Sequence, residues 1–135
     1  MTTWEIEVPL VLDGTGRRLP KRPLTTNVRL HWRRRAECVK TIREIVAVRA
    51  RSVVRIPPQE HITVQLRFSP GDKRRRDAPN LTATQKPAVD GLVDAGIVPD
   101  DTARYVTELM PVLVPSAPRE RRLWLVVQSD EDGQS

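Results

Sequence analysis

Acidic and basic side chains gather between residues 70 and 106 in a pattern that could bind a metal ion and a phosphodiester. A basic run at residues 73–76 ends against Asp77, and the acidic pair Asp100 and Asp101 follows one predicted helix later. Mg²⁺ takes oxygen ligands, typically one or two carboxylates, and completes its octahedron with water and substrate phosphate. The alternative interpretation is a solvated acidic loop beside a surface basic cluster.

A lysine on the segment between these charges could act on a phosphate. Residues 84–95 can form a helix, because Thr84 is a natural N-cap and Gly96 is well placed to end it. Lys86 and Asp90 are four residues apart, so their side chains face each other on one side of that helix. Lys86 could therefore stabilise negative charge in a transition state, or simply pair with Asp90.

The elements that must position these groups follow from hydrophobic periodicity. Residues 62–68 alternate apolar and polar side chains and predict a strand. Residues 34–53 contain neither Gly nor Pro, and their apolar side chains recur near the 3.6 period of an amphipathic helix. Residues 4–12 begin with alternating side chains and end in an apolar run, which predicts a strand. Their proline predicts that this strand lies at an edge of the sheet. Two further strand-like segments, 105–114 and 122–128, predict a C-terminal hairpin.

The charge balance favours a polyanionic partner. The 135 residues have the length of one domain and carry 23 Lys and Arg against 17 Asp and Glu, a net charge of +6. Three of these acids lie in the tail 129–135, which has no Lys or Arg, so that 23 basic and 14 acidic side chains give residues 1–128 a charge of +9. Such an excess favours nucleic acid. The alternative is a solvated basic surface.

Other features exclude several classes of protein. Cys38 is the single cysteine, which excludes an internal disulfide and a multi-cysteine zinc site. No apolar run approaches the roughly 20 residues of a membrane-spanning helix. The N-terminus carries acid where a secretory signal would be positive. We therefore expect a cytoplasmic protein without a membrane partner, with one domain over residues 1–128 and an acidic disordered tail over 129–135.

The segment that carries the charged groups is similar to the signature of a known family. Residues 74–81 read Arg-Arg-Arg-Asp-Ala-Pro-Asn-Leu, Lys86 follows, and residues 90–101 run from Asp-Gly-Leu-Val-Asp-Ala-Gly to the acidic pair. This order resembles the RusA family of Holliday junction resolvases, and the order of the predicted elements is similar along most of the chain. The resemblance implies an α/β fold of the α+β type, with a single mixed sheet of about four to five strands flanked by two helices.

The resemblance also implies a function and a set of site residues. It implies a homodimeric endonuclease that cuts four-way DNA junctions by Mg²⁺-dependent phosphodiester hydrolysis in recombination and repair, with Mn²⁺ as an alternative ion. The implied catalytic residues are Asp77, Lys86 and Asp101. The implied metal ligands are Asp77, Asp101, Asp100 and Asn80, with Asp90 in a supporting position.

Basic side chains in two places are expected to contact the phosphates of branched DNA without reading its sequence. They are Lys73, Arg74, Arg75 and Arg76 in the motif, and Arg33, Arg34 and Arg35 at the entry of the first helix. For the second group the alternative is a solvated helix start. Trp32, set among these arginines, could stack on DNA bases.

Two departures from the family pattern lie inside the motif. Pro79 stands where the family has a second catalytic aspartate, and proline offers no side-chain oxygen. About three additional residues, 82–84, precede Lys86. These departures leave open an alternative function, that of a catalytically weak or inactive relative that binds branched DNA without cutting it. A basic protein-interaction domain without affinity for DNA is a third interpretation.

Overall fold

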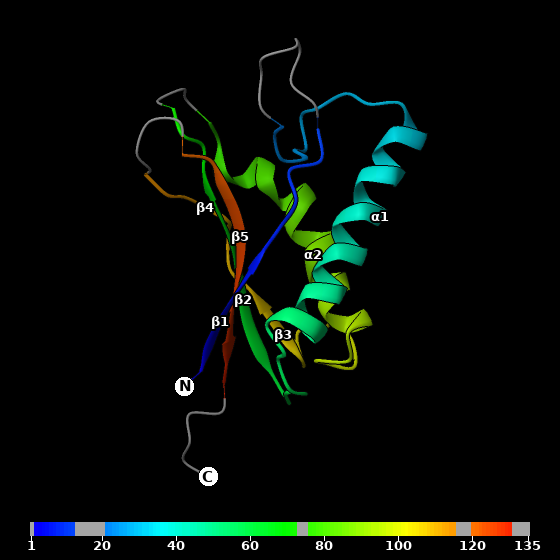
Figure 1. Cartoon of the computed structure of the whole chain (residues 1–135), viewed down its shortest axis with the longest axis vertical. Coiled ribbons are helices and arrows are strands. Elements are labelled where there is room, and N and C mark those ends of the chain that lie inside the picture. Colours follow the sequence, from blue (N-terminus) through cyan, green and yellow to red (C-terminus); the bar gives the residue numbers. More distant parts are fainter. Residues whose placement is uncertain (1, 13–20, 73–75, 116–119, 131–135) are drawn as a thin grey trace.

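The computed structural model describes residues 2–12, 21–72, 76–115 and 120–130 (Figure 1). Its strands are β1 (Thr3–Glu7), β2 (Ile62–Ser69), β3 (Val106–Glu108), β4 (Val112–Leu113) and β5 (Arg122–Ser129). Its helices are α1 (Trp32–Val48), which continues in the π-helical turn η1 (Arg49–Val53), and α2 (Thr82–Asp94), which follows the 3-10 turn η2 (Ala78–Leu81). No helix in these ranges is long and apolar enough to cross a membrane.

The five strands form a single mixed sheet in the order β1-β5-β2-β3, and β4 also pairs with β2. β5 is antiparallel to β1 and β2, whereas β3 and β4 are parallel to β2. A parallel pair needs a crossover connection, which α2 supplies between β2 and β3. The predicted α+β fold with one mixed sheet and two helices is confirmed, and both helices cover the same face of the sheet (Figure 1).

The predicted C-terminal hairpin is wrong. β5 pairs with β2 along its whole length, from Ser129 opposite Ile62 to Arg122 opposite Ser69, and with β1 on its other side. The segment 105–114 is divided into the short strands β3 and β4, which pair with β2 instead. The long alternating strand β2 offers β5 more pairing than two short strands can. β1 does lie at the edge of the sheet, as its proline-containing segment predicts.

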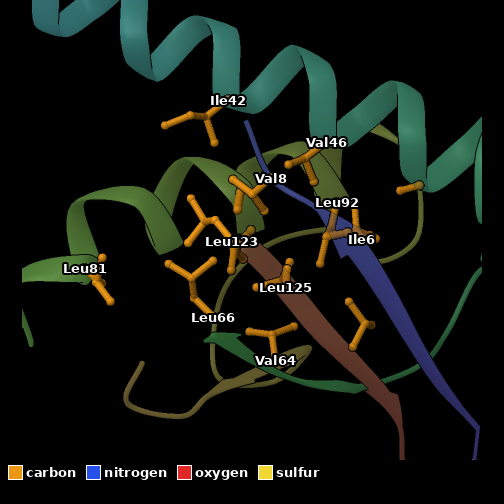
Figure 2. Close-up of a cluster of buried hydrophobic side chains, with 14 of the residues drawn as sticks. Ile6, Val8, Ile42, Val46, Val64, Leu66, Leu81, Leu92, Leu123 and Leu125 are labelled. Carbon is orange, nitrogen blue, oxygen red and sulfur yellow. The ribbon is translucent and has the colours of Figure 1, made fainter. Parts of the chain in front are cut away.

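The core lies between the sheet and the two helices (Figure 2). The predicted alternation over residues 62–68 is confirmed, because the apolar side chains there are buried and the polar ones are partly exposed. β5 presents Leu123 and Leu125 to the same side, and Leu125 stands opposite Leu66 in the sheet register. α1 adds a stripe with a spacing of four, Cys38, Ile42 and Val46, and burial of this stripe stabilises the packing of the helix on the core.

The two helices pack in close contact at Gly91 of α2. A Cβ atom built there would lie 2.6 Å from the carbonyl oxygen of Arg43 in α1, so only glycine permits this approach. The Arg43 guanidinium donates to both carboxylate oxygens of Asp94, at 2.5 and 2.8 Å. The bidentate pair fixes the end of α2 against α1.

A buried glutamine joins α2 to the sheet. The side-chain oxygen of Gln85 accepts from the backbone N–H of Leu66 in β2 at 2.9 Å, and its amide nitrogen donates to the carbonyl oxygen of Leu109 at 3.0 Å. Leu109 lies between β3 and β4, where the parallel ladder with β2 is interrupted. Gln85 therefore takes the place of a strand residue in this gap and attaches α2 to the sheet next to Lys86.

The start of α2 differs from the prediction. The helix begins at Thr82, after the 3-10 turn, and the hydroxyl of Thr84 is buried and donates to the carbonyl oxygen of Leu24 at 2.6 Å rather than capping the helix. Pro87 consequently lies inside the helix and not in its first turn.

The first two residues of the expected tail, 129 and 130, are part of the fold. β5 extends through Ser129, and the Asp130 carboxylate accepts from the Thr63 hydroxyl at 3.0 Å and lies 3.2 Å from Nε2 of His61. Residues 131–135 lie outside the described residues.

Candidate functional site

A lysine and two aspartates from different parts of the motif meet beside α2. The ammonium group of Lys86 lies 3.0 Å from an oxygen of Asp90, one helical turn away, and donates a hydrogen bond to Oδ2 of Asp101. Lys86 and Asp101 are 15 residues apart in the sequence. The side chain of Lys86 is 56% exposed and that of Asp101 is 29% exposed, so a ligand can reach the cluster from solvent. We call these three residues the Lys86 cluster.

The loop after α2 returns Asp101 to the helix. Gly96 has a φ of 79°, the left-handed conformation that ends a helix, and the buried Ile97 donates from its N–H to the carbonyl oxygen of Leu92 at 3.2 Å. The side chain of Asp100 then accepts from the N–H of Asp101 at 2.8 Å. This contact ties the backbone of Asp101 to the side chain of the preceding residue. Asp100 thus supports its neighbour in this structure.

The contacts within the cluster favour the charged forms of both partners. The hydrogen bond from Lys86, with a smaller Coulomb contribution, lowers the pKa of the Asp101 carboxyl below its ordinary value of 3.8. The hydrogen bond to Asp101 raises the pKa of Lys86 above 10.5, against the opposing effect of desolvation. Both groups are therefore ionised at neutral pH.

This pKa shift predicts how the pair affects stability. Because the pKa of Asp101 is lower in the folded chain, its contribution to the free energy of unfolding is complete above pH 3.8 and is lost as the pH falls through the folded-state pKa. Urea denaturation of the wild type and Asp101→Asn should show a difference below about 1 kcal/mol at neutral pH, since the pair is largely solvated. The difference should shrink as the pH is lowered below 3.8. A difference that grows on acidification would contradict this assignment.

Asp77 and Asn80 lie at the other end of the motif, before α2. The carbonyl oxygen of Asp77 accepts from the N–H of Asn80 at 3.1 Å, and the exposed Asp77 side chain makes no hydrogen bond or ion pair with the described residues. The side-chain oxygen of Asn80 accepts from the hydroxyl of Thr26 at 2.9 Å. A backbone hydrogen bond from the N–H of Thr26 to the carbonyl oxygen of Asn80, also 2.9 Å, completes the contact. Asn80 thus has a structural role in joining the motif to the segment before α1.

The expected metal ligands are only partly brought together. Asp100 and Asp101 are adjacent in the returning loop, whereas no described contact joins them to Asp77 or Asn80. Across the four described ranges, no group of three or more His, Cys, Asp or Glu side chains is arranged to hold a metal ion. The donor chemistry nevertheless suits Mg²⁺, which commonly uses one or two carboxylates and relies on water and phosphate for the rest.

The basic run of the motif is described only at its last residue. Lys73, Arg74 and Arg75 lie outside the described residues. The guanidinium of Arg76 donates to both carboxylate oxygens of Asp72, with the Nη2 bond at 2.9 Å. Arg121 approaches the same carboxylate at 3.8 Å. Asp72, which sequence reasoning missed, therefore offsets part of the positive charge expected to contact DNA.

The arginines at the start of α1 have different surroundings. Arg34 donates to the carbonyl oxygen of Val11 at 3.0 Å, and Arg35 donates to that of Val28 at 3.1 Å. These two hold the preceding chain against the helix. Arg33 is exposed, and its guanidinium carbon lies 5.1 Å from the ring centroid of Trp32. Of the three, Arg33 has the side chain most available to a ligand.

Gln85 is the main positioning residue that the sequence analysis missed. Gln85 lies three residues before Ala88 and four residues before Val89, both of which belong to the buried stripe of α2. A polar side chain on the apolar face of a predicted helix is a signal for a buried hydrogen-bonded group, since such groups are rarely buried without partners. Thr84, buried beside it, carries the same signal.

Comparison with known proteins adds one similarity. No family model matches the chain. The chain is similar to an uncharacterized protein of Xylella fastidiosa (strain Temecula1 / ATCC 700964), with 34% identity over 93 residues. The match covers 65% of this chain and 59% of that protein, so the chain spans less than two thirds of its length. The name of this relative states no activity.

Proposed function

We propose that the chain is a Mg²⁺-dependent endonuclease of the RusA type, which resolves Holliday junctions or related branched DNA by phosphodiester hydrolysis. The observation that carries the proposal is the contact of Lys86 with Asp101. Lys86 and Asp101, which the motif separates by most of a helix and a loop, are in direct contact, and their side chains are 56% and 29% exposed. An ion pair with only a structural role could form without the other charged residues of the motif. A site for a metal ion and a phosphate needs a cationic side chain and carboxylates close together.

The residues of the cluster have distinct roles in this proposal. Asp90 and Asp101 hold the Lys86 ammonium in place, so it can meet a phosphate oxygen without a large loss of side-chain entropy. Its charge then stabilises the negative charge that develops on the phosphate in the transition state. Asp101 is ionised and is the first carboxylate that a cation would meet in this cluster.

Mg²⁺ would be held by Asp101 and Asp100, with Asp77 and the oxygen of Asn80 as the expected partners from the other end of the motif. When bound, it would supply a Lewis acid and lower the pKa of a water molecule. Because the described carboxylates form no group of three, the chain would bind the ion mainly when DNA phosphate completes its coordination.

Two further parts of the proposal concern the assembly and its setting. Symmetric cutting of a four-way junction needs two active sites, which a homodimer with two-fold symmetry would supply. The net charge of +6 would favour association with DNA through counterion release. The activity would belong to DNA recombination and repair in the cytoplasm.

A second function, binding of branched DNA without efficient cutting, is favoured by Pro79. This residue is exposed in the 3-10 turn and brings no ligand oxygen to a position where the family has a carboxylate. The chain would then keep the cation cluster and the basic surface but hold Mg²⁺ too weakly for catalysis.

One experiment separates these functions. A synthetic four-way junction and a linear duplex of matched sequence, each labelled at a 5′ end, are incubated with the chain in Mg²⁺ or in EDTA. The nuclease proposal predicts Mg²⁺-dependent nicks near the branch point and none in the duplex. Retention of intact junction by the wild type, with cleavage gained by Pro79→Asp, would favour the binding function. If the chain neither retained nor cut the junction, both functions would be rejected.

A further inference from the structure

Trp32, the first residue of α1, is a large apolar side chain that the core does not use. It is 68% exposed, whereas Trp124 is only 6% exposed. The His31 ring is stacked on it with centroids 5.6 Å apart and an interplanar angle of 29°. The guanidinium carbon of Arg33 lies 5.1 Å from its ring centroid. Since most of the indole surface stays accessible, these contacts leave room for a further planar group.

The arrangement is held in place by the start of the helix. His31 is the N-cap residue, and its Nδ1 accepts from the N–H of Arg33 at 3.2 Å, which orients the ring. The hydrogen bonds of Arg34 and Arg35 to earlier carbonyl oxygens join this end of α1 to the neighbouring chain. The aromatic pair is therefore preorganised, and a ligand would meet it at a small cost in side-chain entropy.

The charges around the indole select the class of ligand. Residues 29–36 contain four arginines and no acid, and the first acid after them, Glu37, lies 3.6 Å from Arg34. An exposed indole among guanidinium groups suits a polyanion that also carries flat π systems, because bases stack on aromatic rings while arginines contact phosphates. A nucleobase in a paired duplex has its faces covered by its neighbours. An unpaired base, in contrast, can place a free face on Trp32.

We propose that Trp32, flanked by His31 and Arg33, is a stacking platform for an unpaired base of a DNA strand at a branch point. This inference rests on the proposed function for the branched substrate, since strand separation at the branch exposes such bases. The platform itself lies on α1 and shares no residue with the Lys86 cluster, so the two can be tested independently.

The test uses the intrinsic fluorescence of the full chain. An oligothymidylate of about 12 nucleotides, within the usual range of site sizes, should quench the emission of exposed Trp32, and a fully paired duplex should quench it much less. Because both variants lack this fluorophore, their affinities are read from the anisotropy of a dye-labelled oligothymidylate: Trp32→Ala should weaken binding by about five- to a hundredfold, and Trp32→Phe should recover most of the affinity. Trp32 is exposed, so neither variant should unfold the chain.

Salt dependence separates stacking from charge. Arg33→Gln should reduce the slope of log affinity against log salt by about 0.7, the value for one phosphate contact with a single strand, whereas Trp32→Ala should lower affinity at every salt concentration and leave the slope unchanged. Equal affinity of the wild type and Trp32→Ala for the oligothymidylate would overturn the platform. Quenching that depends on Trp32 in a chain that cuts no junction would retain the platform and reject the nuclease.

Discussion

Asp101→Asn is expected to slow Mg²⁺-dependent cleavage of a four-way junction by at least about a hundredfold, while the chain remains folded and still binds the junction. The substitution keeps the shape of the side chain and removes its charge. It therefore removes both the carboxylate offered to a cation and one of the two anions that hold Lys86. The measurement is the single-turnover rate of strand nicking at saturating protein.

The matched control is Glu44→Gln, which makes the same chemical change on the exposed face of α1. Glu44 lies 3.9 Å from Lys40, its partner one helical turn away, and its side chain is 63% exposed. We expect its nicking rate to equal that of the wild type. Lys86→Gln should be slowed by a similar factor to Asp101→Asn. Because the two residues act as a unit, the double variant should be little slower than either single variant. If the slowing factors of the two single variants multiplied in the double variant, a shared role would be contradicted.

Gln85→Ala is expected to reduce the free energy of unfolding by about 2–5 kcal/mol. The substitution leaves the buried N–H of Leu66 and the carbonyl oxygen of Leu109 without their partners and opens a cavity between α2 and the sheet. Urea denaturation followed by circular dichroism measures the change. In a folded sample, junction cleavage should also decrease, since Lys86 is the next residue on the helix.

Gln65→Ala is the control for this prediction. Gln65 lies on β2 and donates to the carbonyl oxygen of Met110 at 3.0 Å, a hydrogen bond of the same type in exposed surroundings. Water can replace that bond, so the expected loss is below about 1 kcal/mol. Equal losses for the two variants would show that Gln85 is not the buried connection described above.

Elements with a local sequence pattern are predicted correctly, whereas the pairing of strands that lie far apart in the sequence is not. The alternation of residues 62–68 identifies β2, and the regular apolar spacing identifies α1. The position of β5 between β1 and β2 depends on contacts across most of the chain, which periodicity does not contain. The early start of α2 was missed because the 3-10 turn at Ala78–Leu81 continues directly into the helix.

In the candidate site, too, contacts between residues close in the sequence are predicted and contacts between distant residues are not. The pairing of Lys86 with Asp90 follows from their helical spacing and is confirmed. Its contact with Asp101 depends on the loop after Gly96, whose path is set by buried side chains rather than by spacing. The attachment of Asn80 to Thr26 crosses 54 residues and has no local signal.

The measurement that tests the account most directly is the uptake of a divalent ion by the chain on a four-way junction. Mn²⁺ can replace Mg²⁺ for this purpose, and electron paramagnetic resonance reports the free ion. The wild type with the junction should remove Mn²⁺ from solution beyond what the junction alone removes, and Asp101→Asn and Asp77→Asn should each abolish this uptake. Equal uptake by the wild type and both variants, or no uptake by the wild type, would contradict a metal site shared by these two carboxylates.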